Sequence, residues 1–321
     1  MNKLLDVVVI GAGPAGLTCA GLLAAKGRSV RVIDKGRGPG GRLSTRRGSS
    51  ARLDHGCQFL ATDDPRGNEI IHGWDEAGVS GRWSPRMPDG MAPPKFAGDH
   101  WRIGIPAMNE VVKHLTSDLD VEYGFRAASL RRMDDHWVIE QEGEPNSLAA
   151  SRVVVAIPSP QAIDLLKPVG FSGISELEKA QYDPVWSLLL EGDSLPQLDW
   201  DALVSEEAPL GLLAVQSSKP GRSASPAWVG LATTQWSREH LEDDHDSVQS
   251  ALVESCSRIT GEAVEASATV HRWRHAIVSR PVGVDCVSDL DRGLIACGDW
   301  CLGPTVSHAL ASGQAAARQL C

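Results

Sequence analysis

The stretch LDVVVIGAGPAGLTCAGLLAAKGRSVRVID, residues 5–34, decides the fold of this chain. A short β-branched run ending in glycines is followed by small and apolar residues at helical spacing over Pro14–Lys26. Gly27 stands where this helix is expected to stop, and a second apolar run, Ser29–Ile33, ends in Asp34. The stretch therefore predicts one βαβ unit with its two strands paired in parallel.

The turn GAGPAG, residues 11–16, has the spacing of a dinucleotide-binding fingerprint. Gly11 permits the tight turn, Gly13 lets the backbone approach a diphosphate, and Gly16 allows the helix to pack closely on the strand. Asp34 stands where a carboxylate accepts hydrogen bonds from an adenosine ribose. Because strand, helix and acid occur together, a plain glycine-rich turn is the weaker interpretation. The predicted cofactor contacts here are Gly11, Ala12, Gly13, Ala15, Gly16, Asp34 and Lys35.

A glycine- and arginine-rich segment, residues 36–50, follows this acid. Its composition suits a loop wrapped around an anion better than a packed element. An arginine in such a loop can contact the diphosphate from the side opposite the helix, so Gly41 and Arg42 are predicted cofactor contacts. A solvated basic loop is the alternative.

A second nucleotide-contacting segment, GDWC at residues 298–301, lies near the end of the sequence. It follows a short strand, Gly293–Cys297, and precedes an alanine-rich helix, Ala309–Leu320. A glycine-aspartate pair there suits the ribityl chain of a flavin, and the next helix N-terminus would face the flavin O2 edge. A nicotinamide-binding domain would lack this element, so the sequence favours FAD. Gly298, Asp299 and Val306 complete this set of predicted contacts.

The size and charge of the chain limit its class. Its 321 residues exceed what one ordinary hydrophobic core covers, so two domains are expected. The net charge of −10 argues against a general nucleic-acid surface, since phosphate binding needs clustered cations. The seven cysteines show no CxxC spacing and are interpreted as reduced thiols. With no long apolar run, a cytoplasmic protein without membrane contact is expected.

The rest of the sequence predicts an α/β architecture with two interleaved domains. Residues 63–104 contain Pro65, Pro85, Pro88, Pro93 and Pro94 and are expected to be irregular, whereas Val121–Ile139 alternates like hairpin strands and Arg152–Ile157 like a buried strand. An amphipathic helix, Ser247–Ile259, and strand-like runs at 187–190, 211–215 and 228–232 predict a separate α+β layer. We expect a discontinuous Rossmann-type FAD-binding domain at 1–63, 105–160 and 284–321, and an α+β substrate domain at 64–104 and 161–283.

Seven motifs spread over nearly the whole chain together resemble the renalase family, and its bacterial members most of all. They are the GAGPAG turn, KGRGPGGR at 35–42, LDHGCQF at 53–59, SKPGR at 218–222, TQWS at 234–237, HRWRH at 271–275 and GDWC. The GGR and GDWC segments are shared with the wider flavin amine oxidase superfamily. The resemblance implies a p-hydroxybenzoate-hydroxylase-like flavoprotein with non-covalent FAD. It further implies oxidation of 1,2- and 1,6-dihydro isomers of NAD(P) to NAD(P)+, with O2 reduced to hydrogen peroxide.

The predicted substrate site needs few reactive groups. Hydride transfer to a flavin mainly requires two flat rings held face to face, and the sequence accordingly lacks G-x-S-x-G and HExxH motifs. The resemblance places Gln58 and Phe59 beside the flavin and Trp273 at the pocket wall. A packing role is the alternative for both Trp273 and Trp236, and a structural hydrogen-bonded histidine is the alternative for His275. The predicted catalytic residues are Phe59, Trp236, Trp273 and His275, and Gln58 and Ala127 are further predicted cofactor contacts.

Departures from the family pattern bear on the substrate more than on FAD. Phe59 stands where relatives often have Tyr, Leu231 where they often have His, and Ser307 and His308 where a Glu-Gly pair is common. These changes remove polar groups from the expected pocket. The alternatives to a dihydronicotinamide oxidase are an amine oxidase or desaturase of the same superfamily, and a protein in which FAD is structural or redox-sensing without turnover.

Overall fold

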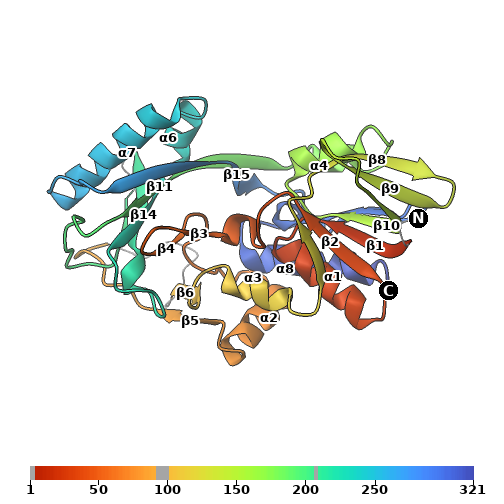
Figure 1. The fold of residues 1–321 in the computed structure, drawn as a ribbon, viewed down its shortest axis with the longest axis horizontal. Helices are drawn as coiled ribbons and strands as arrows, with labels where there is room; N and C mark the ends of the chain where they lie inside the picture. The colour runs from red at the N-terminus through yellow and green to blue at the C-terminus, as the bar shows by residue number, and fades with distance from the viewer. Residues whose placement is uncertain (1–3, 92–100, 206–208) are drawn as a thin grey trace.

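An eight-stranded sheet forms one half of the molecule and lies on the right of Figure 1. The computed structural model describes residues 4–91, 101–205 and 209–321. Six strands follow the order β16-β17-β10-β1-β2-β7, while β9 pairs with β10 and β8 with β9. The bounds are β1 (Leu5–Ile10), β2 (Val30–Asp34), β7 (Asp120–Tyr123), β8 (Ala127–Met133), β9 (His136–Gln141), β10 (Ser147–Val155), β16 (Val287–Asp289) and β17 (Leu294–Ala296).

The predicted βαβ unit is present. β1 and β2 pair in parallel, with Val8 opposite Arg31, and α1 (Pro14–Ala25) connects them through Gly27 at φ 78°. β10 pairs in parallel with β1 on its other side. Tyr123 does not lie in a hairpin as predicted, because β7 pairs in parallel with β2. β8 and β9 do form the expected hairpin.

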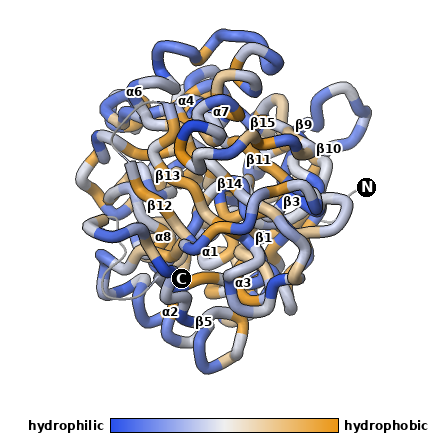
Figure 2. The backbone as a smooth tube through the Cα atoms, turned by 90° about the vertical axis from the view of Figure 1, so that its left-hand side faces the viewer, coloured by the Kyte–Doolittle hydropathy of each residue, from blue (hydrophilic) through white to orange (hydrophobic). Residues whose placement is uncertain are grey.

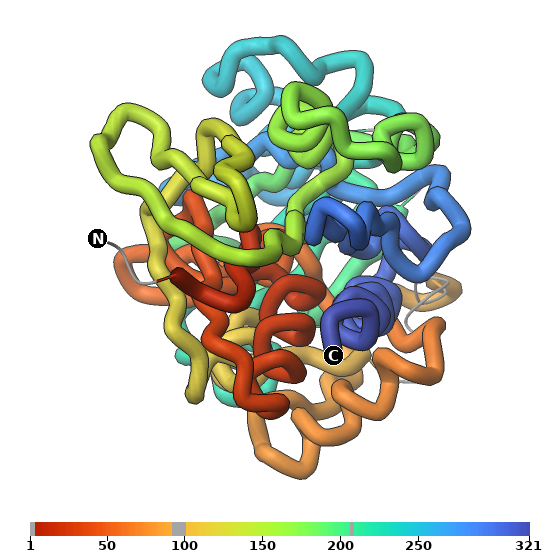
Figure 3. Tube along the Cα trace, turned by 90° about the vertical axis from the view of Figure 1, so that its right-hand side faces the viewer, coloured from red at the N-terminus to blue at the C-terminus, as the bar shows by residue number. Residues whose placement is uncertain are grey.

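The two ends of the described chain pack together. α8 (Val306–Arg318) runs alongside α1, as the blue and red helices of Figure 3 show. A side chain at Gly313 would collide with the Ala15 backbone, so the helices are in very close contact there. The short η3 (Asp299–Cys301) connects β17 to α8. The predicted C-terminal strand and helix are therefore both present, next to the first βαβ unit.

A second sheet, in the order β12-β13-β14-β11-β15, forms the other half of the molecule (Figure 1). Two helices, α6 and α7, lie over it, and the hydrophobic strands beneath are visible as orange stretches of tube in Figure 2. The expected amphipathic helix is α7 and the expected strand runs are present. The bounds are β11 (Gln181–Glu191), β12 (Ala202–Val204), β13 (Leu210–Val215), β14 (Ala227–Ala232), β15 (Ser267–Arg280), α6 (Thr234–Glu239) and α7 (His245–Thr260).

The segment 63–104, expected to be irregular, contains regular structure where it is described. α2 (Pro65–Glu76) begins with Asp64 as its N-cap, whose carboxylate accepts from the Arg66 amide at 2.9 Å. Pro65 occupies the first helical position, where a missing N–H does no harm, so proline did not exclude a helix. β5 (Ser80–Trp83) and β6 (Trp101–Gly104) form a two-stranded sheet. Pro93 and Pro94 lie outside the described residues.

Within the described ranges, no helix combines the length and apolarity needed to cross a membrane. All seven cysteines are free thiols, as predicted.

Short elements connect the two sheets. They are η1 (Gly41–Leu43), β3 (Thr45–Arg47), β4 (Arg52–Asp54), α3 (Glu110–Leu115), α4 (Ser159–Leu166), α5 (Ile174–Leu177) and η2 (Gln216–Ser218).

Candidate functional site

The glycine turn between β1 and α1 leaves open space in front of the helix N-terminus. Gly11 has φ 114°, and a Cβ there would lie 2.5 Å from the Ala156 carbonyl oxygen. A side chain at Gly16 would collide with the Gly11 carbonyl. A Cβ at Gly13, in contrast, would meet no atom within 4 Å. The turn is therefore tight against the sheet and open at the position where a diphosphate could approach the helix amides.

Asp34 connects this turn to the next loop. Its two carboxylate oxygens accept hydrogen bonds from the Ala12 amide at 2.7 Å and the Gly36 amide at 2.6 Å. The Gly40 amide donates to the Ala12 carbonyl at 2.9 Å, and a Cβ on Gly41 would lie 4.0 Å from Gly13 Cα. The two glycine-rich segments thus face each other. Each Asp34 oxygen keeps a further lone pair that a ribose hydroxyl could use.

An ion pair joins the glycine-rich loop to the far end of the chain. Arg42 Nη2 lies 2.6 Å from Asp299 Oδ1, and Arg42 Nη1 donates to the Ala276 carbonyl at 3.0 Å. Asp299 is only 6% exposed. Burial lowers the pKa of Arg42, but the Asp299 carboxylate outweighs this effect and the net pKa is raised. We call the GAGPAG turn, Asp34, residues 40–42 and Asp299 the cofactor cradle.

The remaining predicted cofactor contacts lie around this cradle. The Lys35 ammonium contacts Gln161 Oε1 at 3.2 Å, and burial lowers its pKa. Ala127 starts β8, two residues after Phe125, whose amide donates to the Asp34 carbonyl at 3.0 Å. Val306 is the first residue of α8. Lys35 thus directly follows the carboxyl end of β2, the kind of position at which open α/β sheets bind ligands, whereas Ala127 and Val306 begin other elements.

Two histidines and a tryptophan form a cluster of flat rings that we call the ring wall: His55, His271 and Trp273. The centroid distances are 4.3 Å between His271 and Trp273, 5.0 Å between the histidines, and 5.2 Å between His55 and Trp273. His271 and Trp273 are alternate residues of β15 and so share one face of that strand. His55 follows β4 directly. The wall therefore joins the second sheet to the segment that carries Gln58.

The ring wall is held in place and uncharged. The His55 carbonyl accepts from Trp273 Nε1 at 2.9 Å and from the Ser187 hydroxyl at 2.6 Å. Burial, aided by repulsion from His271 and Arg46, lowers the pKa of His55 to about 4, and burial together with Arg46 lowers that of His271 to about 4. Both imidazoles are therefore neutral at pH 7.

The other predicted catalytic residues divide between two places. His275 lies two residues beyond Trp273, with its ring 5.2 Å from Tyr182, and burial and the charge of Arg42 lower its pKa. Trp236 stacks on His240 at 4.2 Å and belongs to the hydrophobic core beneath α6 and α7. The structure does not bring Trp236 to the ring wall, because α6 packs it into that core.

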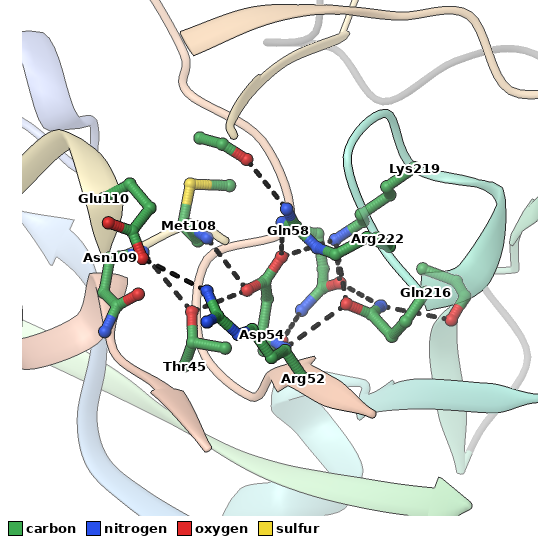
Figure 4. A network of polar contacts seen from close by, with 12 residues as sticks. Thr45, Arg52, Asp54, Gln58, Met108, Asn109, Glu110, Gln216, Lys219 and Arg222 are labelled. Carbon is green, nitrogen blue, oxygen red and sulfur yellow. Dashed lines mark hydrogen bonds and ion pairs between the residues drawn. The ribbon is translucent and has the colours of Figure 1, made fainter. Parts of the chain in front are cut away.

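Gln58 belongs to a buried polar cluster, the Asp54 network, shown in Figure 4. Asp54 is fully buried and its carboxylate accepts from Lys219 Nζ at 3.1 Å, Arg222 Nη2 at 2.6 Å and the Thr45 hydroxyl at 2.7 Å. Lys219 Nζ also contacts Gln58 Oε1 at 3.0 Å, and Gln58 Nε2 donates to the Asp54 carbonyl. The network fixes the segment between Asp54 and Gln58 to the η2 loop.

The charges in this network are unequal, with two cations against one carboxylate. Burial alone would raise the pKa of Asp54, but Lys219 and Arg222 hold it at about 2. Burial lowers the pKa of Lys219, partly offset by Asp54. Because removing one partner of a buried ion pair leaves an uncompensated charge, the three side chains depend on each other.

Phe59 lies against an aromatic group at the other end of the same segment. Its ring is 5.0 Å from that of Trp101, which contacts Trp83 edge-on at 5.1 Å. Lys219 Nζ lies 5.3 Å above the Trp83 ring, close enough for a cation–π contact. Phe59 is half-buried and packs against the hydrophobic core of the first sheet.

The departures from the family pattern have structural roles. The Ser307 hydroxyl accepts from the amides of Asp63 and Asp64, each at 3.0 Å, which connects the start of α8 to the start of α2. His308 Nδ1 lies 2.7 Å from the Thr305 hydroxyl in a capping box. Leu231 packs against a small core cluster beside β4. None of these contacts reaches Trp273.

His55, Asp54, Lys219 and Arg222 were given no individual role by sequence reasoning. All four lie in the LDHGCQF and SKPGR motifs, which were recognised only as part of a resemblance. The available signal was the presence of charged residues within these two short motifs. What connects them is a set of contacts between residues about 165 positions apart, which no local pattern encodes.

Sequence comparisons match part of this chain to a dinucleotide-binding family and to two oxidases. Residues 9–74 match a family described as an NAD(P)-binding Rossmann-like domain. One of the polypeptides of the opine oxidase of Rhizobium meliloti (strain 1021) is 44% identical over 69 residues, which are 22% of this chain and 15% of that protein. Putrescine oxidase of Kocuria rosea is 40% identical over 74 residues, 23% of this chain and 15% of that protein. The alignments thus span only about a seventh of these curated relatives.

Solved structures share the fold over the whole chain. Cyclohexylamine oxidase from Brevibacterium oxydans IH-35A aligns with a TM-score of 0.76 at 13% identity, covering 99% of both chains. Putrescine oxidase bound to putrescine aligns with a TM-score of 0.67 at 14% identity, covering 98% of both chains. The chain therefore shares its fold with these two oxidases. The predicted α/β class with a Rossmann-type dinucleotide-binding sheet is confirmed.

Proposed function

We propose that this chain is a FAD-dependent oxidase that takes a hydride from 1,2- or 1,6-dihydronicotinamide dinucleotides and reduces O2 to hydrogen peroxide. The single observation that carries the flavin assignment is the Arg42–Asp299 ion pair at 2.6 Å. It connects the loop after the first βαβ unit to the loop before α8, so one site receives contacts from both ends of the chain.

The cofactor cradle fits a non-covalently bound FAD. The space in front of Gly13 would receive the diphosphate, with the α1 amides on one side and Arg42 on the other. Asp34 would bind the adenosine ribose, and Asp299 and the start of α8 would hold the flavin end. Gly298, Val306, Lys35 and Ala127 are proposed as further contacts. The FAD-binding domain would comprise residues 1–63, 105–160 and 284–321, and the substrate domain 64–104 and 161–283.

The ring wall and Phe59 would hold the nicotinamide substrate. A bound flavin would accept the hydride and deliver electrons to O2. The residues of this chain have to orient a flat ring and exclude water, which the packed rings of His271 and Trp273 and the Asp54 network suit. Trp273 and His275 remain proposed substrate contacts, whereas Trp236 is proposed to act only through the core.

Amine oxidation is the second candidate, because the relatives and structural neighbours include oxidases named for amines. Oxidation of an alkylammonium substrate needs the substrate to lose a proton. The histidines of the ring wall, with pKa values of about 4, are poor acceptors for that proton. Hydride transfer from a dihydronicotinamide releases no proton at this stage, so the uncharged wall favours that reaction.

Anaerobic mixing of the purified holoprotein with isomeric dihydronicotinamides would test the proposal. Rapid loss of the flavin's visible absorbance, with hydrogen peroxide formed when air is admitted, is the expected result. Bleaching by primary amines and not by dihydronicotinamides would establish the second candidate instead. If no hydride donor reduces the flavin, FAD is structural or redox-sensing.

A further inference from the structure

A cleft of about 410 Å³ opens at the surface between the β3–β4 hairpin and the loop after η2. This volume lies within the range of roughly 300–1,000 Å³ typical of small-molecule sites. The cleft is distinct from the cofactor cradle, with which it shares no lining residue. Its lining consists of Arg47, Gly48, Ser49, Ser50, Ala51, Arg52, Pro106, Gly221, Arg222 and Ser223.

The lining is strongly cationic in a chain whose net charge is −10. Three of the ten lining residues are arginines, three are serines, and none is an aspartate or glutamate. Guanidinium groups bind phosphate oxygens in bidentate fashion, and serine hydroxyls add neutral donors. The chemistry of the lining therefore suits a phosphate or diphosphate group.

The acidic side chains next to the cleft are already engaged. Glu110 pairs with Arg52 at 3.3 Å and more closely with Lys113 at 2.7 Å, while Glu191 accepts from the amides of Ser49 and Ser50. Arg47 forms no ion pair with any described residue. Among the three arginines of the cleft, Arg47 is thus the one left without a counter-ion in the described part of the chain, since Arg52 pairs with Glu110 and Arg222 with Asp54.

Arg222 forms a preorganised floor for the cleft. Its side chain is 2% exposed, and it is fixed by Asp54 at 2.6 Å and by the Gly104 carbonyl at 3.1 Å. Its Nε–H group is buried and has no hydrogen-bond partner among the described residues. A buried guanidinium donor without a partner is unfavourable, so an acceptor supplied beside Arg222 would stabilise this side chain.

The walls of the cleft are also connected to each other. The Ser223 hydroxyl donates to the Ser50 carbonyl at 3.3 Å, across the opening. Gly221 has φ 74°, and a Cβ there would lie 2.8 Å from Ile105 Cγ2 and 3.3 Å from Pro106 Cα. Only glycine allows this close approach in that conformation. The arginines are therefore carried on two loops held in a defined arrangement.

We propose that this cleft is a phosphate-recognition subsite, and that it holds the diphosphate of the nucleotide substrate. The assignment to substrate rests on the proposed function. Arg222 connects the cleft directly to Asp54, and Asp54 is bonded to Gln58 in the segment that carries Phe59. Contact with the diphosphate and orientation of the nicotinamide ring would thus depend on one shared network.

The test compares a double variant, R47A with R52A, with an R82A control. Arg82 is exposed on β5, outside the cleft, so its loss removes one surface charge only. Calorimetry should show inorganic diphosphate binding to the wild-type and R82A holoproteins and about a tenfold weakening or more in the double variant. The wild-type affinity should fall as salt is raised. Equal binding by all three proteins, or no binding, would overturn the subsite.

Kinetics then separate substrate recognition from binding of free phosphate. The double variant should raise KM about tenfold for dihydronicotinamide dinucleotides and leave kcat unchanged, while KM for a dihydronicotinamide riboside without phosphate should stay the same. Equal KM changes for both donors would refute the role in substrate binding. If wild-type protein binds diphosphate but oxidises neither donor, the subsite stands and the proposed function fails.

Discussion

The cofactor cradle and the ring wall differ in what builds them. The cradle depends mainly on backbone positions, because Gly11, Gly13 and Gly16 act by lacking side chains and Asp34 binds amides. The ring wall depends on side chains from separate elements that meet only in the folded protein. The comparison teaches that a backbone-built anion site leaves a local sequence signature, whereas a side-chain-built substrate site does not.

The largest effect is expected from a side chain in the open space of the cradle. Gly13→Val should fold, since a Cβ there meets nothing within 4 Å, but it should weaken FAD binding by about a hundredfold or more because it occupies the diphosphate position. The matched control is Gly21→Val in the same helix, where a Cβ also meets nothing. FAD content after purification is the measurement. Stoichiometric FAD in the Gly13 variant would disprove the assigned diphosphate site.

Loss of the carboxylate of the Asp54 network should destabilise the protein more than loss of one of its two cations. Asp54→Asn leaves two buried cations without a counter-ion and should destabilise the protein by about 3–5 kcal/mol. Lys219→Met leaves Arg222 paired with Asp54 and should be clearly less harmful. Thermal midpoints of both holoproteins give the comparison. If the lysine variant is the less stable one, the excess positive charge is not a strain on the fold.

Substitutions in the ring wall should change substrate oxidation and leave FAD binding unchanged. Trp273→Leu removes one ring and the bond to the His55 carbonyl, so kcat/KM should fall about tenfold while FAD content stays full. Trp236→Phe, in the core beneath α6, should leave kcat/KM unchanged. Steady-state kinetics with the same donor decide the matter. A larger loss in the Trp236 variant would move the substrate site away from β15.

The two buried histidines should also make stability depend on acid pH. The folded-state pKa values of His55 and His271 are about 4, below the ordinary value of 6.5, so the unfolded chain binds protons first as pH falls. Stability should therefore decrease between about pH 6.5 and 4. The paired Asp54, with its pKa near 2, adds a loss only below about pH 4. His271→Asn should flatten the first slope; an unchanged slope would show that these histidines are not its source.

Much of the fold could be predicted because its signals are local. The βαβ unit, α7 and the strand before GDWC follow from periodicity and glycine positions. α2 was missed because the five prolines of residues 63–104 outweighed the Asp64-Pro65 start signal, although Ile70, Ile71 and Trp74 have helical spacing. The parallel pairing of β7 was missed because alternation does not reveal the partner of a strand.

The candidate site could be predicted only in part. Arg42 and Asp299 were each recognised from their own motifs, but their ion pair joins residues 257 positions apart, and the Lys219–Asp54 contact joins residues 165 positions apart. Trp236 and Trp273 look alike in sequence, and only packing distinguishes a core tryptophan from one at the ring wall.

The most direct test of the central claim is anaerobic reduction of the wild-type holoprotein by a single equivalent of a 1,2- or 1,6-dihydronicotinamide dinucleotide. The account predicts a stoichiometric two-electron loss of flavin absorbance with NAD(P)+ as the product. A flavin that stays oxidised with these donors but is reduced by an amine would contradict it.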